Sequence, residues 1–202
     1  MIPKVEFVYF GAFDRGLSKL VKRGWTKRNE KYARMRIKTL ESAWRRLEGK
    51  TLKEMAKATG LKWRDKKITC YVINYGLAPT SHPLILALHE RDRRARRDLK
   101  LIDDLVHELI HVLFVSNNFS RLKIWKRFEK ERKGVRAHVY LYALHTHLFL
   151  KIFGENRLKR ERKWAEGREN TGQIYARAWE IVDRYSHENL LKRLKNAVKR
   201  RK

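Results

Sequence analysis

Short runs of β-branched, aromatic and other apolar residues predict three strands in the first half of the chain. The first covers residues 5–10 and ends before Gly11, and the second covers residues 68–75. The third is a nearly continuous apolar run over residues 82–90. Turn residues that include Pro79 separate the second strand from the third. These runs predict a small sheet.

Apolar residues recur every three or four positions in the longer segments, which is the period of an α-helix. Residues 101–115 and 135–153 are the two most apolar of these segments, and Gly154 closes the second. The more polar predicted helices cover residues 26–47 with a stop at Gly49, residues 52–59 with Thr51 as cap and Gly60 as stop, residues 122–133, and residues 174–198. Together these elements predict a helix-rich α+β fold with a small sheet before the helix at 101–115.

Basic residues are dense near the start of the chain, which suggests a division at residue 66. We expect a basic helical extension in residues 1–66 and a second domain in residues 67–202 that ends in a basic helix. Residues 51–61 resemble the opening of a helix-turn-helix unit. A strand follows them where a recognition helix would be needed, so we favour an ordinary helix ended by glycine.

The distribution of charge marks the interior of the protein. Lys and Arg total 50 against 22 acidic residues, which gives a net charge of +28 over 202 residues. Residues 68–90, 101–120 and 137–150 nevertheless contain no Lys or Arg, and they hold seven of the eight histidines. Because long cationic side chains are almost never buried without a partner, these three windows are expected to form the core.

Composition excludes several classes of protein. The single cysteine, Cys70, rules out a disulfide scaffold and a cysteine-rich zinc finger. The first residues lack the pattern of a secretory signal, and residues 137–153 are too short and too rich in histidine for a membrane span. We therefore expect a cytoplasmic protein.

The segment His107-Glu108-Leu109-Ile110-His111 carries the clearest chemical signal. Histidines four positions apart lie on one face of a helix, so both imidazoles can reach one metal ion. Glu108 lies about 100° further round the helix and can reach a water molecule on that ion without binding the ion itself. The flanking residues are apolar, which favours a zinc site over two ordinary core histidines.

This motif and its surroundings resemble the zincin metallopeptidases over about residues 68–153. The resemblance implies a zincin-like α+β domain that hydrolyses peptide bonds, with the strand at 82–90 as the edge that holds an extended peptide. The metzincin extension is excluded, because Phe114 and Asn117 stand where that group has Gly and His. A gluzincin-like or a minimal SprT-like site remains.

The third zinc ligand is expected on the buried helix at 135–153. His138, Tyr142 and His145 fall on one stripe of that helix, and we take His138 as the ligand. His145 and the gluzincin-type Glu180 are the alternatives. Asp104 lies one turn before the motif and would either orient a ligand imidazole or lie exposed at the helix start.

The expected reaction follows from these residues. Three protein ligands leave one zinc position for water, from which Glu108 takes a proton as general base. Tyr142 or His145 would donate a hydrogen bond to the carbonyl oxygen of the protein or peptide substrate. The cofactor we expect is therefore Zn²⁺ and the enzyme class a metalloendopeptidase.

The excess positive charge indicates a second property. Basic clusters such as residues 91–97 and 192–202 are interleaved with six tryptophans, which suits contact with nucleic-acid phosphates. We expect association with DNA or RNA with little sequence preference. The alternative function is a basic nucleic-acid-binding protein whose metal site is structural or inactive.

Overall fold

The computed structural model describes residues 1–20, 22, 24–76, 78–89, 97–168 and 171–201. The fold is α+β, as the sequence predicts: helices dominate and one small mixed sheet is present. The chain divides into two compact units. The first contains residues 1–50 and 65–112, and the second contains residues 51–64 and 113–202.

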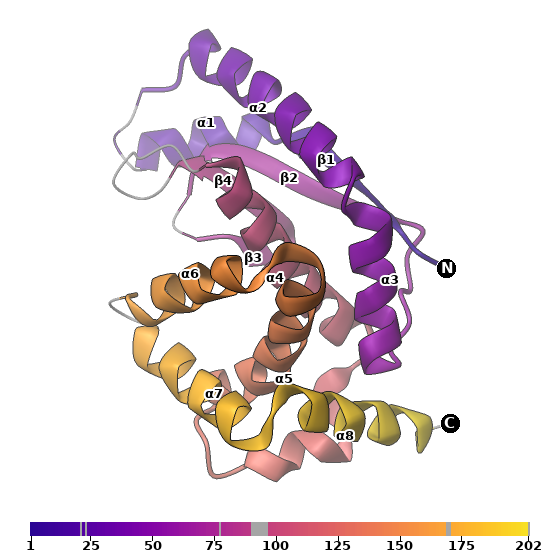
Figure 1. Cartoon of the computed structure of the whole chain (residues 1–202). Coiled ribbons are helices and arrows are strands. Elements are labelled where there is room, and N and C mark those ends of the chain that lie inside the picture. The colour runs from indigo at the N-terminus through magenta and orange to yellow at the C-terminus, as the bar shows by residue number, and fades with distance from the viewer. Residues whose placement is uncertain (21, 23, 77, 90–96, 169–170, 202) are drawn as a thin grey trace. The chain divides into compact units, whose positions relative to one another are not determined.

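The sheet belongs to the first unit and has the strand order β1-β2-β4-β3 (Figure 1). β1 (Lys4–Tyr9) and β4 (Leu84–His89) both run parallel to β2 (Lys67–Tyr75), so β2 is the central strand. The short β3 (Thr80–Ser81) pairs with the start of β4 in the antiparallel direction. The middle of β2 is fully buried at Cys70 and Val72, which accounts for its continuous apolar sequence.

Two helices of the first unit pack on the sheet. α1 (Gly11–Leu20) contacts β2, and α2 (Lys27–Arg45) contacts β1 and β2. A capping box starts α2: the Thr26 hydroxyl accepts from the Asn29 backbone, and the Asn29 side chain accepts from the Thr26 backbone. α4 (Asp98–Ser116) begins in this unit and contains the HExxH motif.

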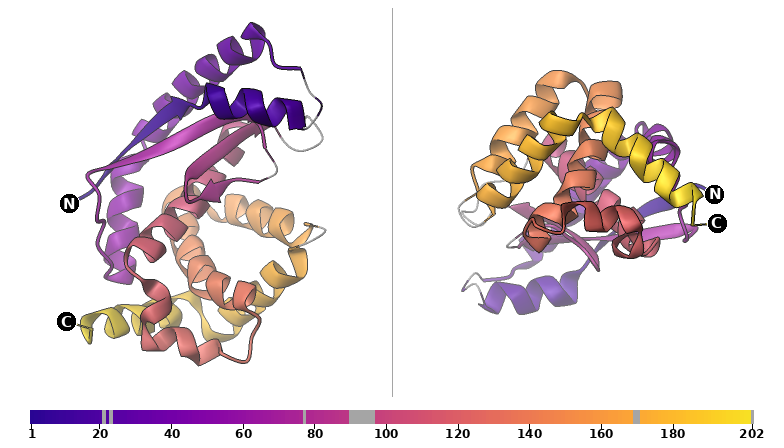
Figure 2. Two further views of the ribbon diagram at one scale, coloured as in Figure 1. Left: turned by 180° about the vertical axis from the view of Figure 1, so that it is seen from behind. Right: turned by 90° about the horizontal axis from the view of Figure 1, so that it is seen from below.

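The second unit is helical in its described residues. α5 (Lys133–Leu148) is its central element and packs against α7 (Gly172–Tyr185) and α8 (His187–Lys199), as both views in Figure 2 show. A π-turn, η3 (Phe149–Phe153), joins α5 to α6 (Glu155–Glu166). Two 3₁₀ turns, η1 (Phe119–Arg121) and η2 (Lys123–Phe128), precede α5. Residues 51–64 also belong to this unit, and they include most of α3 (Glu48–Thr59). None of the described helices is long and apolar enough to cross a membrane.

Most predicted strands and helices are confirmed, but several helices differ from the prediction. The predicted helix at 122–133 is only the 3₁₀ turn η2 over residues 123–128, and α1 and α6 were not predicted. Gly49 does not end a helix and Thr51 does not cap one, because α3 starts at Glu48 and contains both residues. The predicted helix at 174–198 is two helices, α7 and α8. Ser186 separates them with a positive φ of 57° and accepts a hydrogen bond from the Asn189 backbone, so it begins α8.

The position of β4 differs from the expected edge strand. β3 covers one side of β4 at residues 84 and 85, so β4 is the second strand from the end of the sheet. The sequence of β3 gave no strand signal because it is only two residues long. The edge prediction was therefore wrong for the start of β4.

The division of the chain also differs from the boundary that charge suggested at residue 66. β1 pairs with β2 along its whole length, from Lys4 opposite Lys67 to Tyr9 opposite Val72. Residues 1–50 therefore belong to the same unit as the sheet, whereas residues 51–64 belong to the helical unit. Charge patterning reports which faces are solvated, and it contains no information on which distant strands pair.

A buried polar network fixes α1 on the sheet. The Asp14 carboxylate is almost fully buried and accepts hydrogen bonds from the Asn74 backbone at 2.9 Å, the Asn74 amide at 2.7 Å and the Tyr9 hydroxyl at 2.8 Å. The Trp25 indole in turn donates to the Tyr9 oxygen at 2.9 Å. Burial and the neighbouring Asp14 charge raise the pKa of Tyr9 to about 12, so its hydroxyl stays a donor.

The substitution Asp14→Ala is expected to lower the free energy of unfolding by about 3 kcal/mol, because three buried donors lose a charged acceptor. Urea denaturation followed by circular dichroism measures this change. Asp65→Ala is the matched control, since Asp65 is exposed and should change stability by less than about 0.5 kcal/mol. Equal stability of the two variants would contradict the role of the network.

Candidate metal centre

α4 holds the HExxH motif in one uninterrupted helix. Its leucines at positions 101, 105, 109 and 113 are fully buried, so the helix is fixed by an apolar side while the motif residues lie on another. The rings of His107 and His111 lie 5.1 Å apart between centroids, on consecutive turns. Both histidines are half-buried. The spacing therefore aligns two imidazoles as the sequence predicts.

Glu108 is buried, with 8% of its surface exposed. Burial raises the pKa of the Cys70 thiol on β2, and the negative charge of Glu108 raises it further. The carboxylate of Glu108 is therefore close enough to the central strand to act on it electrostatically.

His138 is on α5, one turn after Gly134. Its Nδ1 lies 2.7 Å from the Gly134 carbonyl oxygen, and because a carbonyl can only accept, the proton is on Nδ1. This tautomer leaves the Nε2 lone pair as the group that can bind a metal. Burial lowers the pKa of His138, which keeps the ring neutral. Sequence reasoning missed the part of Gly134, although the spacing of four residues on a helix could have indicated it.

One group of side chains among the described residues has the geometry of a metal site. His107, His111 and His138 each offer one ring nitrogen, and these atoms all lie within 4.8 Å of one another. Zinc accepts three histidines and binds each nitrogen at about 2.0–2.1 Å, so the three residues have the chemistry of zinc ligands. The sequence left His138, His145 and Glu180 as candidates for the third ligand, and of these the group contains His138.

Tyr142 and His145 lie in an aromatic cluster of the second unit. The Tyr142 ring stacks on Trp179 with centroids 4.2 Å apart, and its centroid is 5.6 Å from that of His138. Burial raises the pKa of Tyr142 well above its ordinary value, so the phenol keeps its proton. His145 is 2% exposed and stacks on Phe149 at 4.0 Å. Their catalytic roles stay predictions.

The other charged candidates have protein partners. Glu180 is exposed, and Arg177 binds its carboxylate at 2.9 Å. Asp104 is buried and accepts from Lys100, one turn earlier on the same helix, so it is not an exposed acid at the helix start. The group of residues that could share a metal contains neither of them.

No family model, curated protein or solved structure matches this chain. The assignment of function therefore depends on the geometry of the side chains alone.

Replacement of a histidine from the HExxH motif, or of the histidine on α5, tests the metal site. The variants His107→Ala and His138→Ala are expected to bind zinc at least about 100-fold more weakly than the wild type, which should hold one ion per chain. Elemental analysis after dialysis against graded zinc buffers measures the affinity. His82→Ala is the control, because His82 is exposed beside β3 and bonds to Ser81. Full zinc binding by His138→Ala would exclude His138 as a ligand.

Proposed function

We propose that this protein is a zinc metallopeptidase in which His107, His111 and His138 bind the ion and Glu108 is the general base. The observation that carries the proposal is the set of three histidine nitrogens within 4.8 Å, beside a buried glutamate in an HExxH helix. The two histidines of the motif are half-buried and lie four residues apart on one apolar helix, so both rings can reach a single ion. This constellation suits hydrolysis by an activated water.

Residues of the chain itself would carry out the proton transfers of peptide hydrolysis. Zinc, when bound, would supply an open coordination position that lowers the pKa of water and polarises a carbonyl. Glu108 accepts a proton from the water and passes it to the amine that leaves when the peptide bond breaks. The neutral state of His138 serves this site, since a protonated imidazole cannot bind a metal.

Tyr142 is the candidate donor to the carbonyl oxygen of the substrate. Its raised pKa keeps a proton on the phenol at neutral pH, which a donor requires. His145 was the alternative, and its stacking on Phe149 favours a packing role. The substrate would be a protein or peptide in extended form. β3 pairs with β4 at residues 84 and 85, and residues 86–88 are almost completely buried, so β4 is not proposed as the edge that binds the substrate.

The variant Glu108→Gln separates metal binding from catalysis. It is expected to keep one zinc per chain while peptide hydrolysis falls by about 10²–10⁴-fold, because the amide cannot accept the proton. The measurement is cleavage of a mixed peptide library, read by mass spectrometry, together with zinc content.

Glu155→Gln is the matched control for this variant, because Glu155 is an exposed glutamate paired with Lys159. It should leave both readouts unchanged. A zinc-loaded wild type that cleaves no peptide, or a fully active Glu108→Gln variant, would refute the peptidase. The alternative of a basic binding protein with an inactive metal site would then stand.

We also propose that the protein associates with nucleic acid. The net charge of +28 attracts any polyanion, and the phosphates of DNA and RNA carry one charge per nucleotide. The basic cluster at 91–97 lies outside the described residues except for Arg97, which is exposed. The proposal therefore depends on the cations elsewhere.

Salt dependence tests this association. Affinity for a fluorescent 20-base-pair DNA is expected to fall by about 10³-fold between 50 and 200 mM salt, because bound phosphates release counterions. Fluorescence anisotropy measures the affinity. A peptide nucleic acid of the same sequence has no phosphates and is expected not to bind. Affinity that does not change with salt would contradict the proposal.

A further inference from the structure

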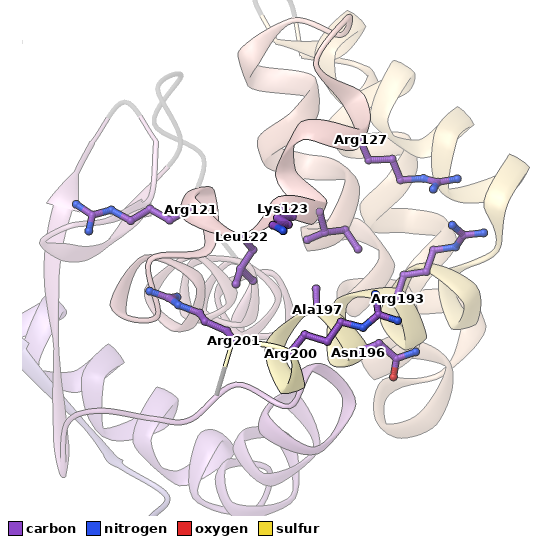
Figure 3. Close-up of a pocket in the computed structure, with 10 residues that line it drawn as sticks. Arg121, Leu122, Lys123, Arg127, Arg193, Asn196, Ala197, Arg200 and Arg201 are labelled. Atoms are coloured by element: carbon purple, nitrogen blue, oxygen red, sulfur yellow. The ribbon is translucent and has the colours of Figure 1, made fainter.

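A hollow of about 830 Å³ on the second unit is surrounded by cations. η1 and η2 form one wall, and α8 with the residues directly after it forms the other (Figure 3). Arg121, Lys123 and Arg127 come from the first wall, and Arg193, Arg200 and Arg201 from the second. All six side chains belong to exposed residues.

A second, smaller hollow of about 290 Å³ adjoins the first, because Leu122 and Arg201 line both. It adds Lys62 and Arg64, from the segment that follows α3. We name the two hollows together the η2–α8 groove. Eight cations line it, and no acidic residue does: Lys62, Arg64, Arg121, Lys123, Arg127, Arg193, Arg200 and Arg201.

The charge of this groove is not neutralised by the rest of the described chain. Some arginines elsewhere pair with acids, as Arg162 does with Asp183 at 2.8 Å and Arg177 with Glu131 at 2.6 Å. Within the ranges that the structure describes, none of the eight groove cations forms an ion pair. Like charges gathered in a groove raise the local potential, which favours an anionic ligand.

Two of the arginines are held in place without losing their charge. Arg201 donates to the Asn117 carbonyl oxygen at 2.8 Å, and Arg127 lies over the Tyr185 ring at 5.1 Å from its centroid. A guanidinium that is already positioned loses less conformational entropy when it binds a phosphate. The groove is therefore partly arranged for its ligand.

The lining residues also indicate the form of the ligand. Proteins that bind single strands commonly stack the bases on aromatic side chains, and no aromatic residue lines either hollow. Apolar contacts come only from aliphatic residues such as Leu122, Ile124 and Ala197. Cations gathered around a groove with no stacking platform suit the phosphates of a duplex, whose bases are already stacked.

We propose that the η2–α8 groove binds the phosphodiester backbone of double-stranded nucleic acid. Arginine and lysine side chains contact successive phosphates, and binding does not depend on base sequence. This inference gives a location to the nucleic-acid association proposed above, and it is independent of the metal centre and of peptide hydrolysis.

The test removes three groove charges at once. The triple variant Lys123→Gln, Arg193→Gln and Arg200→Gln is expected to bind a 20-base-pair DNA at least about 30-fold more weakly at 100 mM salt. The slope of log affinity against log salt should fall by about three, one for each lost phosphate contact. Arg127 and Arg201 are kept because they contact Tyr185 and Asn117 in the fold.

The matched control carries the same loss of charge elsewhere on the second unit. Lys163→Gln, Arg160→Gln and Arg184→Gln change three exposed residues of α6 and α7 that form no ion pair within the described parts of the chain. This control is expected to lose less than about threefold in affinity. Thermal melting by circular dichroism establishes that both variants are folded, and peptide cleavage should be equal in both.

Other results of these binding measurements would contradict the groove, the preference for a duplex, or the association with nucleic acid. Equal losses in the two triple variants would mean that diffuse charge, and no particular groove, attracts DNA. Tighter binding of a single strand than of the duplex, with the groove variant affected, would contradict the duplex assignment. A wild type that binds no nucleic acid would refute the groove and the association, while a cleaved peptide library would leave the peptidase intact.

Discussion

Burial of ionisable groups on α4 is the constraint on which the rest of this structure depends. A carboxylate moved out of water costs several kcal/mol unless a cation or hydrogen-bond donors compensate it. Glu108 is buried on a helix whose leucines at positions 101, 105, 109 and 113 are fully buried, with His107 and His111 on either side of it in sequence. A divalent cation bound by the imidazoles, as we propose, would stabilise the charge of Glu108 further, in addition to the protein groups with which these three residues interact.

The same cost explains how charge is distributed along the chain. Windows without Lys or Arg correspond to β2, β4, α4 and α5, which contain most of the fully buried side chains. The one acid on which α1 depends, Asp14, is buried only because three donors surround it. Most of the positive charge is consequently on exposed faces. Some of these cations pair with acids, as Arg177 does with Glu131, and those that line the η2–α8 groove form no ion pair among the described residues.

Long elements and local spacing could be predicted from the sequence. The strands at β1, β2 and β4 and the helices α4 and α5 are marked by runs of apolar residues that packing alone makes necessary. The turn at Ser186 could not be predicted, because a positive φ at a serine is stabilised by local hydrogen bonds that apolar periodicity does not record. The assignment of residues 51–64 to the helical unit depends on contacts between distant segments, which a single sequence does not contain.

The candidate site shows the same limit. Two ligands four residues apart are fixed by helix geometry, so His107 and His111 followed directly from the sequence. A third ligand from another helix is determined by packing, and a stripe of His138, Tyr142 and His145 predicted the helix face without selecting the residue. Selection comes from the hydrogen bond of His138 to Gly134, which orients one nitrogen, and from the stacking of His145 on Phe149.

The proposed zinc centre and a polycationic surface on one short chain have opposite electrostatic requirements. Three neutral imidazoles bring no negative charge to a divalent ion, so an excess of cations would oppose metal binding if their field reached the site. Ionic screening reduces that field within about 8 Å at physiological salt, and exposed charges interact weakly in water. Residues 101–120 and 137–150 contain no Lys or Arg, so the segments that hold the three histidines bring no cation to them. The charge of Arg168 does reach His138 and helps burial to lower its pKa, which favours the neutral ring that a metal requires. Strong attraction for a polyanion and binding of a divalent cation can then coexist in 202 residues.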